Sequence, residues 1–495
     1  MKTSKLLRFA ATLAAALLLA LPAAAQQPAD FSTFVAIGDS LTAGFTDGCL
    51  VDYAQGDSWG AIIARAAGVT YQQPLISRPG LGPCTFLINL APTFGNRANT
   101  GVPTNSTLAR PYNNLAVPGF KIHDAVATNP TTPAGGLAFI VLRGQGTQLL
   151  QAASLHPTFL LMSLGHNDIL GAATSGTAIE GLTLTPMASI NADLDTIFST
   201  MKAAQGGTGK GLVGTIGDVG TIPFFTTVSP ILALNPATGA PIFALYDSCG
   251  GLAPACPVPA GSLLTLLAAT PLKAGFGIPC AILPPTDPRQ ANCNKPLPDN
   301  LTINPSTGAI SPGVVLTPTE LAAIRARTAE MNSALVTKAT AAGYKIWDEG
   351  GFFADVVAHG RLYGGVTIGT SFLSGGFFGY DGVHPTSIGY AIAADDMIQT
   401  INSFFGNSLP RVDMYPFLAN GNTSAGGYPI GASLAPTPTE QIDWAAAYFG
   451  PDTWHDRLRS IFPDLTRKSR ALEPQEGMPI SNDPASPAAG RDRLN

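Results

Sequence analysis

Two short segments, far apart in the chain, carry residues that could together perform nucleophilic catalysis. Ser40 follows the apolar run Phe34-Val-Ala-Ile in the segment Gly-Asp-Ser-Leu, and Asp381 and His384 share the turn-rich segment Asp-Gly-Val-His-Pro. A serine hydroxyl becomes a nucleophile when an imidazole takes its proton and a carboxylate holds that imidazole in the right tautomer. Only proximity in the folded chain matters, so a wide separation in sequence is no objection. We therefore predict a Ser40–His384–Asp381 triad.

The tripeptide Gly-Asp-Ser occurs twice, ending at Ser40 and at Ser58. Ser40 follows a run that is typical of a buried strand, and open parallel sheets bind their ligands at the carboxyl ends of strands. Ser58 precedes a stretch of helical spacing, where a serine commonly caps the helix. The sequence therefore favours Ser40 as the nucleophile and Ser58 as a helix cap.

The chain has six histidines, and most histidines in proteins are structural. His359 stands four residues after Asp355 and could pair with it on a helix, and His123 is next to Asp124. Neither lies in a turn-rich loop. His384 does, so we expect it to act as the base.

The elements that must position these residues follow from the hydrophobic pattern. Short apolar runs alternate with longer segments of helical spacing, which is typical of βα units and a parallel sheet. The predicted strands are 34–37, 113–117, 158–164, 211–216 and 344–348. The predicted helices are 58–67, 185–204, 317–341 and 388–404, and Thr317-Pro-Thr-Glu320 is a capping signal for the third. The sequence thus predicts an α/β fold, with Ser40 at the carboxyl edge of the sheet.

Residues 220–316 interrupt this alternation with many Pro, Gly and Asn residues and four of the six cysteines. The stretch is too long for a simple connection, so we predict an insertion folded onto the sheet domain. Its distinctly apolar segment, 261–270, predicts a short helix. Four leucines fall on adjacent turns of that helix: Leu263, Leu264, Leu266 and Leu267. Such a face either packs on the core, which is the commoner case, or meets an apolar ligand as a pocket wall or lid.

The two ends of the chain differ from the rest. Residues 1–25 hold three Lys or Arg, an apolar run and small residues before Gln26, which is typical of a cleaved secretory signal. The apolar run is shorter than the about 20 residues that a spanning helix needs, so a membrane anchor is the weaker interpretation. Nine of the last 30 residues are charged, and we expect a disordered tail. The predicted organisation is a signal peptide 1–25, a hydrolase-like domain 26–465 containing the insertion, and a tail 466–495.

All six cysteines follow the predicted signal peptide: Cys49, Cys84, Cys249, Cys256, Cys280 and Cys293. In an exported protein an even set of cysteines is read as disulfides by default. Closeness along the chain favours the pairs Cys49–Cys84, Cys249–Cys256 and Cys280–Cys293. A zinc site is the weaker alternative, because the cysteines have no Cys-x-x-Cys spacing and no His-rich neighbours. We predict no metal and no cofactor.

The charge balance excludes one class of partner. Removing Lys2, Lys5 and Arg8 with the signal takes the formal net charge from −5 to −8, and no stripe of Lys and Arg remains. The electrostatic footprint of a nucleic-acid-binding protein is therefore absent. Because 45% of the residues are hydrophobic and only 12% are charged, a large core can form.

Four short segments stand in a fixed order along the chain: Gly38-Asp-Ser-Leu41, Asn114-Leu-Ala-Val-Pro-Gly119, Gly165-His-Asn-Asp168 and Asp381-Gly-Val-His384-Pro. In this order they resemble the four signature blocks of the GDSL, or SGNH, hydrolase family. One block alone would be a weak signal, whereas four in order are specific. The resemblance covers the sheet core and neither the insertion nor the tail. It implies a flavodoxin-like three-layer α/β/α sandwich, the SGNH hydrolase fold, and hydrolysis of carboxylic esters.

The resemblance also implies a role for each block. Ser40 would attack the ester carbonyl, His384 would act as general base and then acid, and Asp381 would orient His384. The oxyanion hole would consist of the backbone N–H groups of Ser40 and Gly119 and the side-chain amide of Asn167. Each donor aimed at the developing negative charge can be worth about 2.7–4 kcal/mol. Gly119 could instead be only a turn glycine, and Asn167 only a residue that orders its loop.

Two residues depart from the commoner family pattern. Pro118 has no N–H, but the required donor is the N–H of Gly119, so the predicted hole survives. His166 fills the variable position of the third block. It could contact substrate or merely be a neighbour, and the sequence gives it no role.

The resemblance implies a serine ester hydrolase that works through an acyl-enzyme, and the signal-like segment 1–25 predicts that the protein is secreted or periplasmic. The apolar insertion favours a lipase or esterase acting on acyl chains, and a carbohydrate acetylesterase is the alternative, because the same triad on the same fold serves both. A non-catalytic exported binding module is the hypothesis from another class. The expected ligand is a small-molecule or lipid ester. We expect no nucleic-acid partner and no stable membrane span after removal of the signal.

Overall fold

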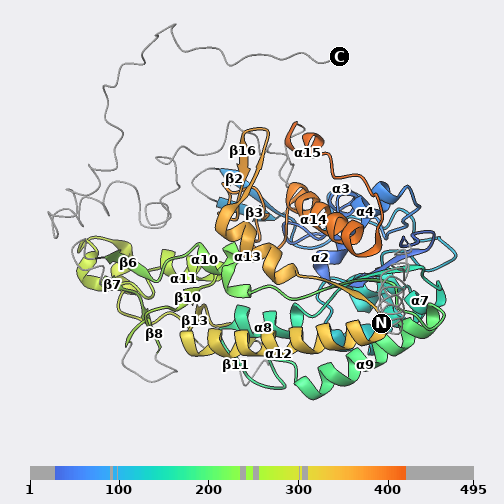
Figure 1. The fold of residues 1–495 in the computed structure, drawn as a ribbon. Coiled ribbons are helices and arrows are strands. Elements are labelled where there is room, and N and C mark those ends of the chain that lie inside the picture. The colour runs from blue at the N-terminus through green and yellow to red at the C-terminus, as the bar shows by residue number, and fades with distance from the viewer. Residues whose placement is uncertain are drawn as a thin grey trace, which may run out of the picture.

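The computed structural model describes residues 28–89, 93–96, 99–234, 241–248, 256–299, 302–303 and 310–419 (Figure 1). The predicted signal peptide 1–25 and the predicted tail 466–495 lie outside the described residues, so both stay predictions. Among the described helices, none has the length and apolar character that crossing a membrane requires.

A parallel sheet forms the centre of the molecule, with its strands in the order β1-β4-β5-β14. The strands are β1 (Phe34–Gly38), β4 (Phe159–Ser163), β5 (Gly211–Gly214) and β14 (Lys345–Trp347). Every residue of β1, β4 and β5 is buried, as expected for parallel strands covered on both faces.

The predicted strand 113–117 is not a regular strand, but this segment bridges to β1 at Asn114 and runs beside it in parallel. The N–H of Ala36 donates to the carbonyl of Asn113, and the N–H groups of Leu115 and Val117 donate back to β1. The spatial order is therefore the second predicted strand, then the first, third, fourth and fifth, which is the flavodoxin-like order. The predicted α/β fold class is confirmed.

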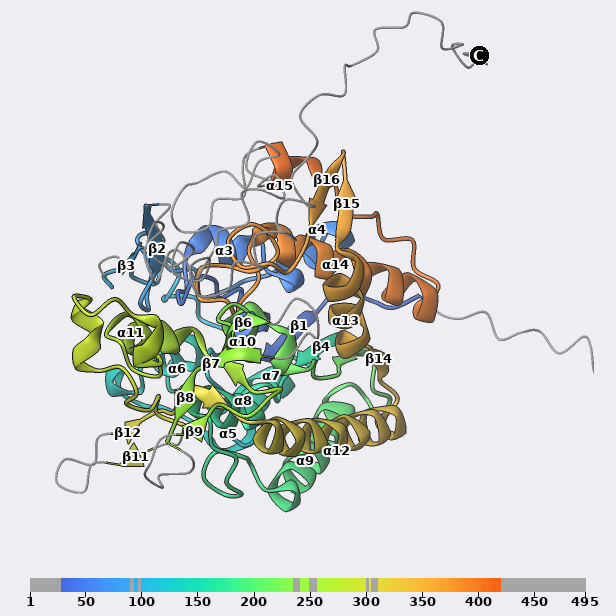
Figure 2. The same cartoon turned by 90° about the vertical axis from the view of Figure 1, so that its left-hand side faces the viewer.

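Side chains alternate along each strand, so both faces of the sheet carry apolar side chains. Helices cover both faces. Val35 and Ile37 pack into one core with α5, α7, α8, α9 and α12, whereas Phe34 and Ala36 pack into a second core with α4, α13 and α14. In Figure 2, α9 and α12 lie below β1, β4 and β14, and α4 and α14 lie above them. The result is the predicted three-layer α/β/α sandwich.

The helices of the sandwich are α2 (Ser40–Ala43), α3 (Asp52–Gly56), α4 (Trp59–Ala67), α5 (Ile122–Ala127), α6 (Gly136–Leu142), α7 (Gln148–Ser154), α8 (Asn167–Ser175), α9 (Met187–Ala204), α12 (Pro318–Ala342), α13 (Glu349–His359), α14 (Ser387–Phe405) and α15 (Tyr415–Ala419). Two hairpins also belong to it: β2 (Thr85–Asn89) with β3 (Thr93–Asn96), and β15 (Arg361–Tyr363) with β16 (Val366–Ile368). The four predicted helices correspond to α4, α9, α12 and α14, with ends that differ by at most two residues.

The predicted caps are present. The Ser58 hydroxyl accepts a hydrogen bond from the N–H of Ala61, so this second Gly-Asp-Ser serine starts α4. At the start of α12, the Thr317 hydroxyl accepts from the N–H of Glu320, and the Glu320 carboxylate accepts from the N–H of Thr317. This reciprocal pair satisfies two N–H groups that a helix start leaves without partners.

The predicted insertion contains small two-stranded pairs and short helices around a core of its own (Figure 2). Its elements are α10 (Pro223–Thr226), β6 (Ile231–Leu234), β7 (Pro241–Ala244), β8 (Tyr246–Asp247), β9 (Cys256–Pro257), β10 (Leu263–Leu264), α11 (Ala269–Lys273), β11 (Thr302–Ile303), β12 (Ile310–Ser311) and β13 (Val315–Leu316). The described strands pair antiparallel as β6 with β7, β8 with β9, β10 with β13, and β11 with β12.

The predicted helix over 261–270 is wrong. Leu263 and Leu264 form β10, which pairs with β13, and α11 begins only at Ala269 after a 3₁₀ turn. The pairing with β13 satisfies the backbone of this apolar run, and no local pattern reveals a partner so far along the chain. Leu264 is fully buried in the core of the insertion, whereas Leu267 is 46% exposed.

Two of the three predicted disulfides are confirmed, namely Cys49–Cys84 and Cys280–Cys293. The third predicted pair contains Cys249, which lies outside the described residues.

Replacing Leu264 with Ala should lower the free energy of unfolding by about 2–5 kcal/mol, because the change opens a cavity in the core of the insertion. The matched control is Leu267→Ala, at an exposed leucine three residues away, which should change stability by less than about 0.5 kcal/mol. Denaturant unfolding of both variants measures the difference. Equal effects at the two positions would contradict the placement of Leu264 in a core.

Candidate active site

Ser40 lies where the sequence predicts, at the carboxyl end of β1. It is the first residue of the one-turn helix α2, and Asp39 caps this helix by accepting the N–H of Leu41 at 3.1 Å. Gly38 allows the turn to approach β4 closely, because a Cβ there would lie 2.4 Å from the carbonyl oxygen of Ser163. The sequence Gly-Asp-Ser thus supplies close approach, a cap and a half-buried hydroxyl.

The structure brings the three predicted triad residues together. His384 Nε2 lies 2.9 Å from the Ser40 hydroxyl oxygen, and His384 Nδ1 lies 2.8 Å from Asp381 Oδ2. With a proton on Nδ1 facing the carboxylate, the lone pair on Nε2 faces the serine hydroxyl. This is the tautomer that a general base requires.

The Asp381 carboxylate is held by several donors at once. Its oxygens accept the N–H groups of Val383, His384 and Gly48, the last at 2.6 Å. Burial alone would raise the pKa of Asp381, but the charge of a protonated His384 and these hydrogen bonds hold the pKa below its ordinary value. Asp381 is therefore kept as an anion beside the imidazole.

A second segment braces the same loop. The carboxylate of Asp47 accepts the N–H of Tyr380 at 2.6 Å, while the N–H of Gly48 donates to Asp381. The next residue is Cys49, which is bound to Cys84. The loop that carries Asp381 is thus fixed to a turn next to a disulfide.

The three predicted oxyanion-hole donors have different surroundings. Within the described part of the chain, the backbone N–H groups of Ser40 and Gly119 donate no hydrogen bond. Gly119 has a φ of 87°, a left-handed conformation that favours glycine. The Asn167 amide donates one hydrogen to the carbonyl of Phe120 at 3.0 Å, and a side-chain amide has a second hydrogen to give.

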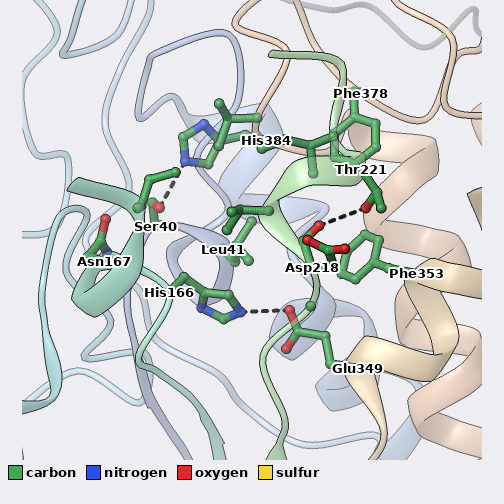
Figure 3. Close-up of a pocket in the computed structure, with 15 residues that line it drawn as sticks. Ser40, Leu41, His166, Asn167, Asp218, Thr221, Glu349, Phe353, Phe378 and His384 are labelled. Atoms are coloured by element: carbon green, nitrogen blue, oxygen red, sulfur yellow. Dashed lines mark hydrogen bonds and ion pairs between the residues drawn. The ribbon is translucent and has the colours of Figure 1, made fainter. Parts of the chain in front are cut away.

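A cavity of about 70 Å³ opens beside Ser40 (Figure 3). Its polar lining consists of Ser40, His166, Asn167, Asp218, Thr221, Glu349 and His384. Its apolar side chains are Leu41, Leu170, Val219, Ile222, Phe353, Phe378 and Val383. Ser40, Asn167 and His384 therefore face one space, whereas Gly119 is not among the residues that line it.

The insertion contacts the loop that carries Asp381 and His384. The N–H of Phe224, in α10, donates to the carbonyl of Gly382 at 2.9 Å, and a Cβ at Gly382 would lie 3.0 Å from Leu266 Cδ1. Ile222, next to α10, reaches the cavity itself. The insertion therefore helps to hold the loop of Asp381 and His384 and to line the cavity.

Sequence reasoning missed a second histidine network under Ser40. His166 Nδ1 lies 2.8 Å from Asp39 Oδ2, and His166 Nε2 lies 2.8 Å from Glu349 Oε1. The Ser163 hydroxyl donates to the other oxygen of Glu349 at 3.0 Å. Burial would lower the pKa of His166, but the two carboxylates raise it well above its ordinary value. A signal did exist, because Glu349 follows the predicted strand 344–348 and so falls at the ligand-binding edge of the sheet.

Asp168, which follows Asn167, is fully buried and holds the start of α5. Its Oδ2 accepts the N–H of Ile122 at 3.0 Å, while its Oδ1 is buried and accepts no hydrogen bond from the residues that the structure describes. Burial raises the pKa of Asp168 to about 6, although the hydrogen bond from Ile122 opposes the shift. This carboxylate is therefore costly to ionise.

The other predicted pairs lie away from the cavity. His359 Nδ1 lies 2.7 Å from Asp355 as predicted for a helical pair, and the partner of His123 is Asp193, at 3.1 Å from its Nδ1. In the described ranges, no three His, Cys, Asp or Glu side chains are grouped as metal ligands.

Comparison with known proteins identifies a family and a structural relative. The family model for the GDSL-like lipase/acylhydrolase matches residues 34–397. The chain is similar to the extracellular lipase of Streptomyces rimosus, with 14% sequence identity and a TM-score of 0.31 over 75% of this chain and 98% of that chain. Among curated proteins, none matches.

Asp168→Asn should stabilise the protein increasingly as the pH rises. The pKa of Asp168 is raised from 3.8 to about 6 on folding, so the native state binds this proton more tightly and the unfolding free energy falls as pH rises through that window. Asn keeps an acceptor for Ile122 and cannot ionise, so the variant should gain up to about 3 kcal/mol over the wild type by pH 7.

Unfolding free energies at pH 4, 5, 6 and 7 test this prediction. The control is Asp195→Asn, at a side chain that is 67% exposed, which should give no gain that grows with pH. A stability difference for Asp168→Asn that stays constant across this range would contradict the buried, costly carboxylate.

Proposed function

The chain belongs to the GDSL-like lipase/acylhydrolase family and is in that general sense an ester hydrolase, and we propose that it is a secreted serine esterase or lipase acting through an acyl-enzyme. The observation that carries this proposal is the pair of contacts made by His384, at 2.9 Å from the Ser40 hydroxyl and 2.8 Å from Asp381, at the wall of a cavity.

In the proposed mechanism the Ser40 oxygen attacks the ester carbonyl carbon while His384 Nε2 takes the hydroxyl proton. Asp381 stabilises the imidazolium that forms. The tetrahedral intermediate collapses as His384 gives its proton to the leaving alcohol, and the acyl group stays on Ser40. Water then attacks the acyl-enzyme with His384 again as base, and the acid is released.

The negative oxygen of each intermediate needs fixed donors. We assign this role to the N–H groups of Ser40 and Gly119 and to the second amide hydrogen of Asn167. In the described part of the chain, these two backbone N–H groups donate no other hydrogen bond. The Asn167 side chain lines the cavity and is held there by its hydrogen bond to the carbonyl of Phe120. Donors fixed before the reaction need no reorganisation when charge develops.

The cavity lining supports an acyl chain as the group that is bound. Seven apolar side chains line it, among them Ile222 at the start of the insertion and Phe353 and Phe378. Burial of a chain contributes about 0.8 kcal/mol per CH₂, so such a wall favours longer acyl groups. The alternative, a carbohydrate acetylesterase, is favoured by the polar side chains Asp218 and Thr221 on the same cavity. Hydrolysis rates across acetyl, butyryl and long-chain esters and acetylated sugars would separate the two.

The proposed location is outside the cytoplasm, in the periplasm or the medium. The disulfides Cys49–Cys84 and Cys280–Cys293 are consistent with an oxidising compartment. The signal-like segment 1–25 supports the same location, and the division into signal, domain with insertion and tail remains part of the proposal. Mapping the first residue of the exported protein tests it.

Replacing Ser40 with Ala should abolish ester hydrolysis and leave the fold intact, because the hydroxyl forms the acyl-enzyme. Ser58→Ala is the matched control from the second Gly-Asp-Ser, and it should cost about 0.5–2 kcal/mol of stability as a lost cap while activity remains. A serine-directed organophosphonate should label the wild type at Ser40 alone. A folded protein that resists labelling would support the non-catalytic binding module instead.

Asn167→Ala should lower kcat by about 10²–10³ with little change in KM, because its amide meets the oxygen mainly after charge has developed. Steady-state kinetics on one ester give both constants. An effect confined to KM would remove Asn167 from the oxyanion hole.

A further inference from the structure

The network of Asp39, His166 and Glu349 does not take part in the mechanism above, although it lies directly beneath Ser40. The side chains of Asp39 and Glu349 are almost fully buried, and that of His166 is 15% exposed. Buried carboxylates are costly unless a positive charge and hydrogen bonds compensate them. The imidazole between them is the compensating group.

The geometry fixes the proton count of this imidazole. Each ring nitrogen of His166 lies 2.8 Å from a carboxylate oxygen, and a carboxylate can only accept. A neutral imidazole has one N–H, so one of the two contacts would set lone pair against lone pair. The protonated ring donates to both carboxylates in charge-assisted bonds. With both carboxyl groups ionised, His166 is therefore an imidazolium.

Each end of this bridge is attached to a part of the catalytic apparatus. Asp39 precedes Ser40, and its second oxygen caps α2 through the N–H of Leu41. His166 precedes Asn167, and Glu349 is tied to the end of β4 through Ser163. One cation therefore links the nucleophile turn, the amide of the oxyanion hole and the start of α13.

We propose that His166 is a positioning residue for ester hydrolysis, which as an imidazolium clamped between Asp39 and Glu349 fixes Ser40 and Asn167 relative to each other. The inference rests on the proposed function. It assigns His166 no contact with the reacting atoms. If the ring of His166 lost one proton, the two buried carboxylates would share a single N–H donor. The turn that carries Ser40 would then no longer be fixed by this network.

The clamp has a consequence for pH dependence. The titratable groups nearest to His166 are Asp39, before α2, and Glu349, on α13. Asp218 and His384 line the same cavity. Asp168 on α8 and Tyr390 on α14 lie further away, and the charges of Asp39 and Glu349 act on Tyr390. The two nearest carboxylates raise the pKa of His166 well above its ordinary value, so this ring keeps its proton to a higher pH than a free imidazole does. We therefore expect an alkaline limit of activity that is set by the loss of this proton.

Glu349→Gln tests the clamp with a side chain of the same size. Removing one anion should move the alkaline limb of kcat/KM to lower pH by about 1–3 units and leave the acid limb in place. His166→Gln should lower kcat at neutral pH by at least tenfold with KM nearly unchanged, and the alkaline limb at that position should disappear. Glu330→Gln, at an exposed glutamate, is the matched control and should change neither limb.

A second measurement needs no catalysis. Proton NMR of the inactive Ser40→Ala protein at pH 8 should show two downfield ring N–H signals that are absent in Ser40→Ala/His166→Gln. A single ring N–H signal from His166 would overturn the inference, as would an unmoved alkaline limb in Glu349→Gln. A wild type that hydrolyses no ester would refute the proposed function, and the NMR result would still decide whether the clamp exists.

Discussion

The close parallel pairing of β1 with β4 is the constraint on which the site depends. The register sets Gly38 opposite Ser163, and the absence of a Cβ at Gly38 lets the two strand ends come together while the Thr42 hydroxyl donates to the carbonyl of Ser163 at 3.2 Å. Beyond this point β1 leads into α2 and β4 leads into α8. The backbone pairing of β1 with β4 therefore brings Ser40 and Asn167 to one cavity.

The two histidines at this edge differ in their partners, and the difference separates their tasks. His384 lies between a carboxylate and a hydroxyl, so its Nε2 can hold a lone pair for the serine proton. His166 lies between two carboxylates, so neither of its nitrogens is available as a base. Two imidazoles that line the same cavity can thus coexist without competing for the same proton.

Much of the fold and of the triad could be predicted because the signals are local. Each strand of the central sheet coincides with an apolar run, α12 begins at a capping box that is visible in four residues, and Ser40 comes two residues after the end of β1. The helix over 261–270 failed because β13, some fifty residues further on, decides the conformation of β10. The role of His166 was missed for the same reason, since its partner Glu349 is 183 residues away and the pairing exists only after the sheet has formed.

The turn at Asp47 and Gly48 links redox chemistry to the triad. The Asp47 carboxylate accepts the N–H of Tyr380, the N–H of Gly48 donates to the Asp381 carboxylate, and the neighbouring Cys49 is bonded to Cys84. If the protein is exported as proposed, that covalent closure forms only after translocation. Before that closure, the turn that binds the loop of Asp381 would be held by its hydrogen bonds alone, without a covalent link to Cys84.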